Sequence, residues 1–304
     1  MSGDTRAAGV IPARVSILTT VHNAGPYLRQ TIDSALAQSF GGWELILVDD
    51  GSTDDSRDIL ASYADARIRV DLLPQNVGRI RALRHAFALA RGEYIAILDA
   101  DDVAHPDRLA RQVAVLDTSP RTMMVGSWAR RINEHGVALG VWQPPVEPRR
   151  LRDALAWGNP FVHSSVTFRR GDAEEVGGYR LDLPWANDYG LWIRLAQRGE
   201  IAMIADILCD WRIVGTSMTR GARHRVDVVR DSLVLLREAG DRLAFAGEAK
   251  IRNRHAITLA EIKSGLTRLR SGGALGGLAT IARAITLDPL ALGRWHRFRN
   301  EHLR

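Results

Sequence analysis

The chain has few of the features that define several large protein classes. Its 304 residues include one cysteine, Cys209, so neither an intrachain disulfide framework nor a thiolate zinc site can form. No stretch approaches the roughly 18 uninterrupted apolar residues of a membrane-spanning helix. The amino-terminal segment lacks the apolar core of a signal peptide. From these absences we expect a cytoplasmic protein, with any membrane contact peripheral and at the cytoplasmic face.

The motifs of several nucleotide-binding and hydrolytic enzymes are also absent. There is no G-x-G-x-x-G after the first predicted strand and no G-x-x-x-x-G-K-[ST] loop. Neither an H-E-x-x-H zinc motif nor a G-x-S-x-G nucleophile elbow occurs. Dinucleotide-binding, P-loop, zinc-protease and serine-hydrolase activities therefore lose their main support.

The composition is that of an ordinary globular protein with an excess of positive charge. Hydrophobic residues make up 46% of the chain and charged residues 25%, which is enough for a large core. The net charge of +6 fits an anionic partner such as a nucleotide or an anionic membrane face. An Arg-rich proteome would produce the same charge, so the charge alone does not identify a partner. We expect no nucleic-acid partner.

Strands and helices alternate along the first 120 residues. The predicted strands are short apolar runs, and the predicted helices carry apolar residues at three-and-four spacing. This alternation predicts an α/β fold with a doubly wound, mostly parallel, Rossmann-like sheet. Ser52 and Asp55 stand at capping-box spacing, which predicts a further helix start. The predicted strands are 15–19, 43–48, 68–73 and 94–98, and the helices between and after them are 27–36, 78–90 and 106–116.

Acidic groups follow two of these strands at their carboxyl ends. Asp49-Asp50 follow the second strand, and Asp99-Ala100-Asp101-Asp102 follow the fourth. Ligands bind beyond the carboxyl ends of strands in doubly wound sheets. Carboxylates this close repel and raise one another's pKa, so a cation would stabilise them. The D-x-D element therefore predicts a site for Mg²⁺ or Mn²⁺ completed by phosphate and water; a solvated turn is the alternative.

After about residue 121 the pattern changes. Short strand-like pieces alternate with Pro- and Gly-rich turns, and two helices are predicted around 149–157 and 188–197. From about residue 220 the chain reads as mainly helical, and basic residues outnumber acidic ones. We therefore divide the chain into residues 1–120, 121–219 and 220–304.

Ordered sequence blocks between residues 12 and 219 resemble glycosyltransferase family 2. The stretch VSILTTVHNAGPYLRQTIDSALAQSFGGWELILVDDGSTDDS at 15–56 is similar to that family's opening signature. In it, a strand leads to an Asn-containing loop, an S-x-x-x-Q-[ST]-[FY] helix end and a strand ending in D-D-G-S-x-D. The further matching blocks are Asn76-Val77-Gly78, RGEY (91–94), LDADD (98–102), HPDRL (105–109), NPFVHSSVTFRR (159–170), GGYR (177–180), NDYGLWIRLAQRG (187–199) and Trp211-Arg212.

The resemblance implies a GT-A fold that moves a sugar from a nucleotide diphosphate sugar, usually a UDP-sugar, to a hydroxyl of a glycan or lipid-linked saccharide. It implies inversion at the anomeric carbon, a Mn²⁺ or Mg²⁺ cofactor and a place in polysaccharide or cell-envelope biosynthesis. Residues 1–120 would form the nucleotide-sugar-binding half and residues 121–219 an acceptor-side α+β half. Residues 220–304 would form a basic helical region. Neither the sugar nor the acceptor can be read from the sequence.

The same resemblance implies roles for individual residues. Asp101 matches the metal-binding acid. Asp188 matches the general base, and a helix-capping aspartate is the alternative reading of that position. On the nucleotide side, Thr20 and His22 lie on the loop that approaches base and ribose, Asp50 matches the acid that hydrogen-bonds the pyrimidine, Arg79 and Arg81 flank the base and diphosphate, and Asp99 matches the ribose-side acid.

Two positions depart from the family pattern. The family usually has two acids where this chain has Asn187 and Asp188, and an amide cannot accept the acceptor's proton. A histidine often stands two residues after the arginine of the Trp211-Arg212 block, but here that residue is Val214. Metal binding is therefore expected to depend on Asp101, phosphate and water. His163 is the candidate substitute on the acceptor side, with a core histidine as the alternative.

Three expectations concern the acceptor and the end of the chain. Trp185 is predicted to face the acceptor, because it stands near Asp188 in a Pro-rich loop. The basic tail, which includes 295–299, could lie on an anionic membrane, pack on the catalytic domain or form a homodimer contact. The alternative to an active enzyme is a nucleotide- or glycan-binding protein on the same scaffold. A nucleotidyltransferase is disfavoured because its Gly-rich, Lys-containing loop is absent.

Overall fold

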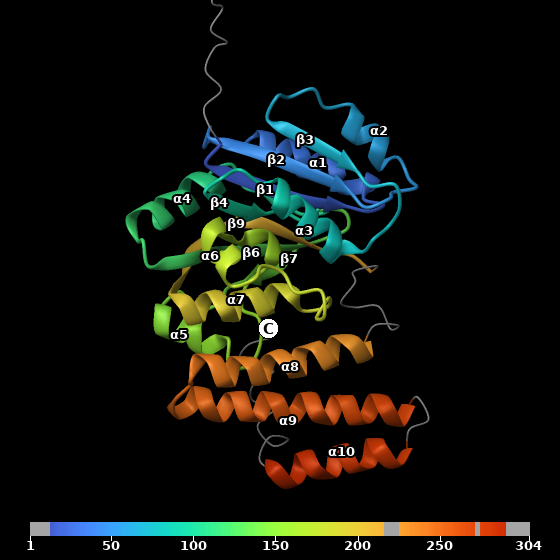
Figure 1. Cartoon of the computed structure of the whole chain (residues 1–304), viewed down its shortest axis with the longest axis vertical. Coiled ribbons are helices and arrows are strands. Elements are labelled where there is room, and N and C mark those ends of the chain that lie inside the picture. The colour runs from blue at the N-terminus through green and yellow to red at the C-terminus, as the bar shows by residue number, and fades with distance from the viewer. Residues whose placement is uncertain (1–12, 216–224, 271–273, 290–304) are drawn as a thin grey trace, which may run out of the picture. The chain divides into compact units, whose positions relative to one another are not determined.

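The computed structural model describes residues 13–215, 225–270 and 274–289 (Figure 1). These residues form two compact units, between which the chain passes several times. Unit 1 consists of residues 1–143, 161–178 and 204–212, and unit 2 consists of residues 144–160, 179–203 and 213–304. The predicted tail segment 295–299 lies outside the described residues.

Unit 1 is built on one mixed sheet, confirming the predicted α/β class. Its strands are β1 (Val15–Val21), β2 (Trp43–Asp49), β3 (Ile68–Leu72), β4 (Tyr94–Ile97), β5 (Val103–Ala104), β6 (Thr122–Asn133), β7 (Ala138–Trp142), β8 (Thr167–Arg169) and β9 (Glu200–Ile213). Their order is β3-β2-β1-β4-β8-β6-β9-β5, with β7 beside β6. The pairs among β3, β2, β1 and β4 are parallel, whereas β8 pairs antiparallel with β4 and β6.

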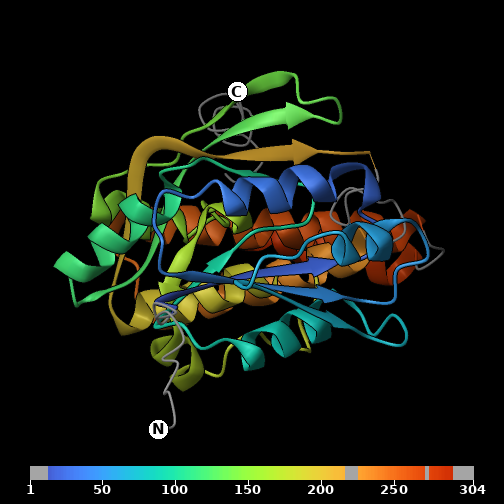
Figure 2. The ribbon, with the colours of Figure 1, turned by 90° about the horizontal axis from the view of Figure 1, so that it is seen from above.

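Of the parallel strands, β1, β2 and β4 are buried because helices cover both faces of this part of the sheet, whereas the edge strand β3 is partly exposed. Figure 2 shows α1 and α3 on opposite faces of β1 and β2. Ile46, Leu47 and Val48 are fully buried, as the continuous apolar run of β2 predicts. The helices of unit 1 are α1 (Gly25–Leu36), α2 (Ser56–Ala61), α3 (Arg79–Leu89), α4 (Arg108–Thr118) and α6 (Arg170–Glu175).

The capping box predicted for α2 is wrong. The helix begins at Ser56, and its N-cap residue, Asp55, makes no side-chain capping hydrogen bond. The Ser52 hydroxyl instead accepts a hydrogen bond from the backbone N–H of Asn23, 3.0 Å away. Ser52 therefore ties the turn after β2 to the loop after β1, a long-range contact that the local spacing does not predict.

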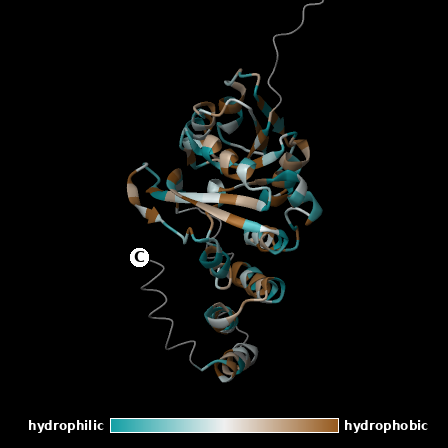
Figure 3. Cartoon of the chain, turned by 90° about the vertical axis from the view of Figure 1, so that its left-hand side faces the viewer, coloured by the Kyte–Doolittle hydropathy of each residue, from teal (hydrophilic) through white to brown (hydrophobic). Residues whose placement is uncertain are grey.

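Unit 2 is mainly helical in its described residues. Its helices are α5 (Pro148–Ala154), α7 (Asn187–Arg198), α8 (Arg225–Leu243), α9 (Gly247–Arg270) and α10 (Ala274–Leu287). Helix α7 packs on α8, α8 on α9, and α9 on α10. Figure 3 shows hydrophilic and hydrophobic residues on the same helices, as expected of amphipathic helices packed in a row. In the parts of the chain that the structure describes, no helix is long and apolar enough to cross a bilayer.

Candidate active site

The acidic loop that follows β4 is held in place from several directions. The backbone N–H of Asp99 donates to the Ser164 hydroxyl at 2.9 Å. The Thr31 hydroxyl of α1 lies 2.9 Å from the carbonyl oxygen of Ala100 and 2.8 Å from that of Asp102. These contacts fix the loop backbone, so the carboxylates project from a rigid turn.

Asp99 forms an ion pair with Arg79 at the start of α3. Arg79 Nη2 lies 2.7 Å from Asp99 Oδ1 and 2.9 Å from His163 Nδ1. His163 is buried, and its Nδ1 lies 3.2 Å from the same carboxylate oxygen. Burial alone would raise the pKa of Asp99, but Arg79 and His163 more than offset it and hold that pKa well below its usual range. Asp99 is therefore a stable anion before any ligand binds.

Asp101 has the opposite electrostatic environment. Burial, followed by the negative charge of Asp99, raises its pKa to about 6. Its carboxylate makes no ion pair within residues 13–215, 225–270 and 274–289. A divalent cation beside Asp101 would relieve both penalties, so this residue fits a metal ligand.

The rest of the coordination would have to come from elsewhere. Among the residues that the structure describes, no cluster of three or more histidine, cysteine, aspartate or glutamate side chains is arranged to hold a metal ion. Mg²⁺ and related ions commonly take one or two carboxylates and complete their shell with phosphate and water. The residues present therefore fit an ion that binds together with a phosphate-bearing ligand.

Arg212 stabilises the acidic loop through hydrogen bonds from its backbone and its side chain. Its backbone N–H donates to Asp102 Oδ1 at 2.7 Å, and its Nε donates to the carbonyl oxygen of Asp101 at 2.7 Å. Its Nη2 donates to Gln30 Oε1 at 2.6 Å, and its guanidinium lies 4.7 Å from the ring centroid of Tyr27. Only 4% of Arg212 is exposed. The sequence placed Arg212 in a matching block but did not indicate this bracing contact.

Asp102 is the third acid of the loop and faces the interior. It is 2% exposed. Burial, followed by the charges of Asp101 and Asp99, raises the pKa of Asp102 well above its usual range. Asp102 is therefore a structural member of the loop and does not present a free carboxylate.

Asp50 holds the loop that precedes α3. Its Oδ1 accepts from the N–H of Val77 at 2.6 Å, and its Oδ2 accepts from the N–H of Gly78 at 3.0 Å. Its neighbour Gly51 has φ 68°, and a Cβ there would lie 2.5 Å from the backbone nitrogen of Asn76. The turn after β2 thus requires glycine, and the Asp50 carboxylate organises the loop in addition to its predicted contact with a base.

His22 lies at the end of β1, where its ring bridges two loops. Its Nδ1 is 2.8 Å from the carbonyl oxygen of Asp50, and its Nε2 is 3.1 Å from Asn76 Nδ2. A carbonyl oxygen only accepts, so Nδ1 carries the proton, and Nε2 can accept from the amide. Thr20 is half-buried on the same strand, and Arg81 is exposed with its Nη1 3.3 Å from the carbonyl oxygen of Val77. Unit 1 thus holds all the residues predicted for the nucleotide and the metal.

Asp188, the predicted base, is in unit 2. It is the second residue of α7. Its Oδ2 accepts from Asn159 Nδ2 at 2.7 Å. Asn187 is 3% exposed and donates from Nδ2 to the carbonyl oxygen of Pro184 at 2.9 Å. The Asn187 side chain therefore points inward. Having asparagine at position 187, where the family usually has an acid, leaves the partly exposed Asp188 carboxylate in place.

The two residues predicted for the acceptor lie in different units. Trp185 is half-buried in unit 2, and its backbone N–H donates to Asp231 Oδ2 at 3.1 Å. His163 belongs to unit 1 and contacts Asp99 and Arg79. The role of Trp185 stays a prediction, whereas the contacts of His163 connect it with the nucleotide-side residues. The sequence block 159–170, which contains Asn159 and His163, matched the family pattern, but the sequence did not indicate which carboxylates these two side chains would contact.

Comparison with known proteins identifies the family. Residues 16–177 match the family described as Glycosyl transferase family 2. The chain is 34% identical to EpsE of Bacillus subtilis (strain 168) over 61% of this chain and 68% of that protein. It is 31% identical to TuaG of the same organism over 67% of this chain and 81% of that protein. Both proteins are provisionally named as glycosyltransferases, and the name of TuaG assigns it to teichuronic acid biosynthesis. A further relative, the uncharacterised Sinorhizobium fredii protein y4gI, is 35% identical, and the chain spans only 24% of its length.

Solved structures confirm the fold. Staphylococcus aureus TarS, residues 1–349 in complex with UDP-GlcNAc, superposes with a TM-score of 0.66 at 16% identity, covering 91% of this chain and 81% of that one. The mannosyltransferase PcManGT from Pyrobaculum calidifontis, in complex with GDP-Man and Mn²⁺, superposes with a TM-score of 0.58 at 21% identity, covering 94% and 85%. The fold is that of GT-A glycosyltransferases, and the chain is a glycosyltransferase that belongs to glycosyl transferase family 2.

Proposed function

We propose that this protein is an inverting, metal-dependent glycosyltransferase that moves a sugar from a UDP-sugar, or another nucleotide diphosphate sugar, to a hydroxyl of a glycan or lipid-linked saccharide. Residues 1–120 would bind the donor and residues 121–219 the acceptor. Two of the similar solved structures support this donor class. The TarS structure is a complex with UDP-GlcNAc, and the PcManGT structure is a complex with GDP-Man and Mn²⁺.

The observation that carries the proposal is the contrast between Asp99 and Asp101. Asp99 is neutralised by Arg79, whereas Asp101, two residues later, has a raised pKa and no ion-pair partner in the described chain. A purely structural acidic turn would pair or expose both carboxylates. One paired and one unpaired acid at the end of β4 is the arrangement expected for a ribose contact beside a metal ligand.

On the donor side, this chain's residues bind and orient the nucleotide sugar. Asp50 and His22 would contact the base, and Asp99 would accept a hydrogen bond from a ribose hydroxyl. Asp101 would hold a Mn²⁺ or Mg²⁺ ion, which supplies positive charge against the diphosphate as negative charge develops there. Arg79 adds a fixed positive charge beside Asp99.

On the acceptor side, Asp188 would take the proton from the attacking hydroxyl. The hydroxyl oxygen forms a bond to the anomeric carbon as the bond from that carbon to the phosphate oxygen breaks. The electron pair of the broken bond leaves with the nucleotide diphosphate. A single displacement of this kind inverts the anomeric centre. A positioned general base contributes about 10²- to 10⁴-fold to the rate.

The test is nucleotide release from UDP-glucose, UDP-galactose, UDP-GlcNAc and GDP-mannose, with Mn²⁺ or Mg²⁺ and with water or a saccharide mixture as acceptor. We expect turnover of at least one donor, lowered about 10²- to 10⁴-fold in Asp188→Asn. Turnover of Asp188→Asn and Asp101→Ala at the wild-type rate would refute the mechanism. Metal-dependent nucleotide binding without turnover of any donor would favour the alternative, a nucleotide- or glycan-binding protein.

A further inference from the structure

The strongest unassigned feature is the set of contacts around Asp188, all within unit 2. Asn159 Nδ2 donates to Asp188 Oδ2 at 2.7 Å. An amide donor on one carboxylate oxygen fixes the plane of the group and leaves the lone pairs of the other oxygen available. Both side chains are partly exposed, so the contact lies where a substrate can reach the carboxylate.

The segment that carries Asn159 is itself fastened to the helices. The Tyr189 hydroxyl, next to Asp188 on α7, donates to the carbonyl oxygen of Leu155. Asn253 of α9 donates from Nδ2 to the carbonyl oxygen of Ala156 at 2.8 Å. Residues 155–159 are therefore anchored at their first two positions and meet Asp188 at their last.

Asn253 also connects α9 with α8. The same Nδ2 donates to the carbonyl oxygen of Leu236 on α8 at 2.8 Å, and the residue is only 7% exposed. A buried amide that bonds two main-chain carbonyls holds both segments in fixed register, since losing it would leave buried acceptors unsatisfied. Asn253 thus links α8, α9 and the segment that supports Asp188.

Helix α8 also holds the segment that precedes Asp188 in the chain. Asp231 is fully buried, and its Oδ2 accepts from the backbone N–H of Trp185, three residues before Asp188. Helices α7 and α8 also approach closely at Gly190, two residues after Asp188. A Cβ at Gly190 would lie 3.1 Å from Cδ2 of Leu235 on α8. The chain on both sides of the base is therefore fastened to α8 or α9.

We propose that Asn159 is a positioning residue for Asp188, and that α8 and α9 maintain this position through Asp231 and Asn253. The proposal rests on the proposed function, in which Asp188 is the base. It gives the C-terminal helices a role in catalysis. Without Asn159, the Asp188 carboxylate rotates away from the attacking hydroxyl, which lowers turnover without changing donor binding.

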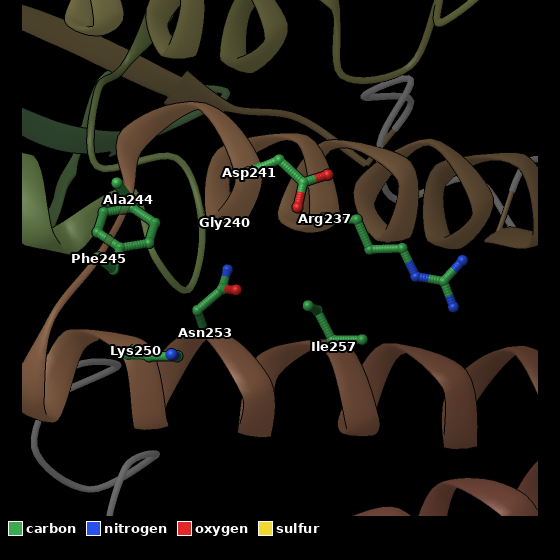
Figure 4. A pocket seen from close by; sticks show the side chains of 8 residues that line it. All are labelled: Arg237, Gly240, Asp241, Ala244, Phe245, Lys250, Asn253 and Ile257. Atoms are coloured by element: carbon green, nitrogen blue, oxygen red, sulfur yellow. The ribbon is translucent and has the colours of Figure 1, made fainter.

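Gly240 and Asn253 both line an open pocket of about 550 Å³ between α8 and α9. A substitution at Gly240 can therefore disturb Asn253 without changing any residue next to Asp188. Figure 4 shows Asn253 pointing from α9 toward Gly240 on α8. A Cβ at Gly240 would lie 2.6 Å from Asn253 Oδ1. Gly240→Ala therefore displaces the Asn253 side chain and leaves Asp188 and Asn159 unaltered. Gly276→Ala in α10 is the matched control, because a Cβ there meets nothing within 4 Å.

The experiment measures nucleotide release from the best donor of the panel with water as acceptor, together with calorimetric binding of UDP and Mn²⁺. Asn159→Leu, which keeps the branching at Cγ and removes the donor, should lower kcat about 10- to 100-fold with the donor KM and UDP affinity unchanged. Gly240→Ala should lower kcat in the same way by about 10-fold, and Gly276→Ala should match the wild type. In an Asp188→Asn background, Asn159→Leu should cost nothing more, because both changes disable one unit.

The outcomes separate the inference from the proposed function. If Asp188→Asn is impaired while Asn159→Leu has wild-type kcat, the inference is overturned and the proposed base stands. If the two changes lower kcat additively, Asn159 acts elsewhere and the inference is also overturned. If Asp188→Asn turns over at the wild-type rate, the proposed base itself is wrong. A melting temperature of Asn159→Leu close to that of the wild type would exclude general unfolding as the cause of a lower kcat.

Discussion

Replacing Asp50 with asparagine should destabilise the protein before any nucleotide binds. The Asp50 carboxylate is 2% exposed and accepts two backbone hydrogen bonds, 2.6 Å from Val77 N and 3.0 Å from Gly78 N. The amide of asparagine has the same shape but only one acceptor oxygen. Its NH₂ group would face one of these N–H groups, leaving a buried donor without a partner.

The size of the effect follows from the two bonds. A hydrogen bond to a charged group contributes about 1.5–3 kcal/mol, and losing one partner of a buried pair also costs the desolvation of the other. One bond is lost and the other loses its charge assistance, so we expect a decrease of about 2–4 kcal/mol in the free energy of unfolding. For a chain of this size, that corresponds to a melting temperature lower by roughly 4–12 °C.

The assay is thermal and urea unfolding of the ligand-free protein, compared with Asp71→Asn. Asp71 is a suitable control because its side chain is 35% exposed and its carboxylate lies 2.8 Å from His85 Nε2, an exposed contact expected to contribute at most about 1 kcal/mol. If Asp50→Asn unfolds like the wild type yet fails to bind UDP, Asp50 serves only the nucleotide, and its assigned role in the loop is wrong.

Three further predictions concern the acidic loop. Asp101→Asn should lower nucleotide release by about 100-fold or more while leaving the melting temperature of the ligand-free protein unchanged or higher, because the repulsion from Asp99 disappears; a clear loss of stability would contradict this. Arg212→Gln should lower the free energy of unfolding by about 1–3 kcal/mol and weaken Mn²⁺-dependent UDP binding measured by calorimetry, since the Nε contact with the carbonyl oxygen of Asp101 is lost while the backbone N–H contact with Asp102 remains; normal affinity would argue against a role of the Arg212 side chain in positioning Asp101. Chelation with EDTA should stop nucleotide release and added Mn²⁺ should restore it, and turnover that persists under chelation would exclude the proposed metal.

The sequence alone determined the fold class, the family and the place of the acidic loop. The alternation of short apolar runs with helical periodicity predicted β1 to β4, and the strand assignments agree with the structure to within about two residues. The position of Asp99 to Asp102 at a strand end followed from the same pattern. These features depend on residues close together in the chain, whose spacing is visible without coordinates.

Only the tertiary structure decided which side chains meet. Asp102 bonds to a residue 110 positions away, Asp99 lies beside one 64 positions away, and Asp188 bonds to one 29 positions away. The partners Arg212, His163 and Asn159 all stood in blocks noted in the sequence. Their contacts depend on how strands pair and helices pack, and long-range geometry of this kind leaves no periodic signal in the chain. The same geometry buried the Asn187 side chain and left Asp188 partly exposed, which the sequence did not show.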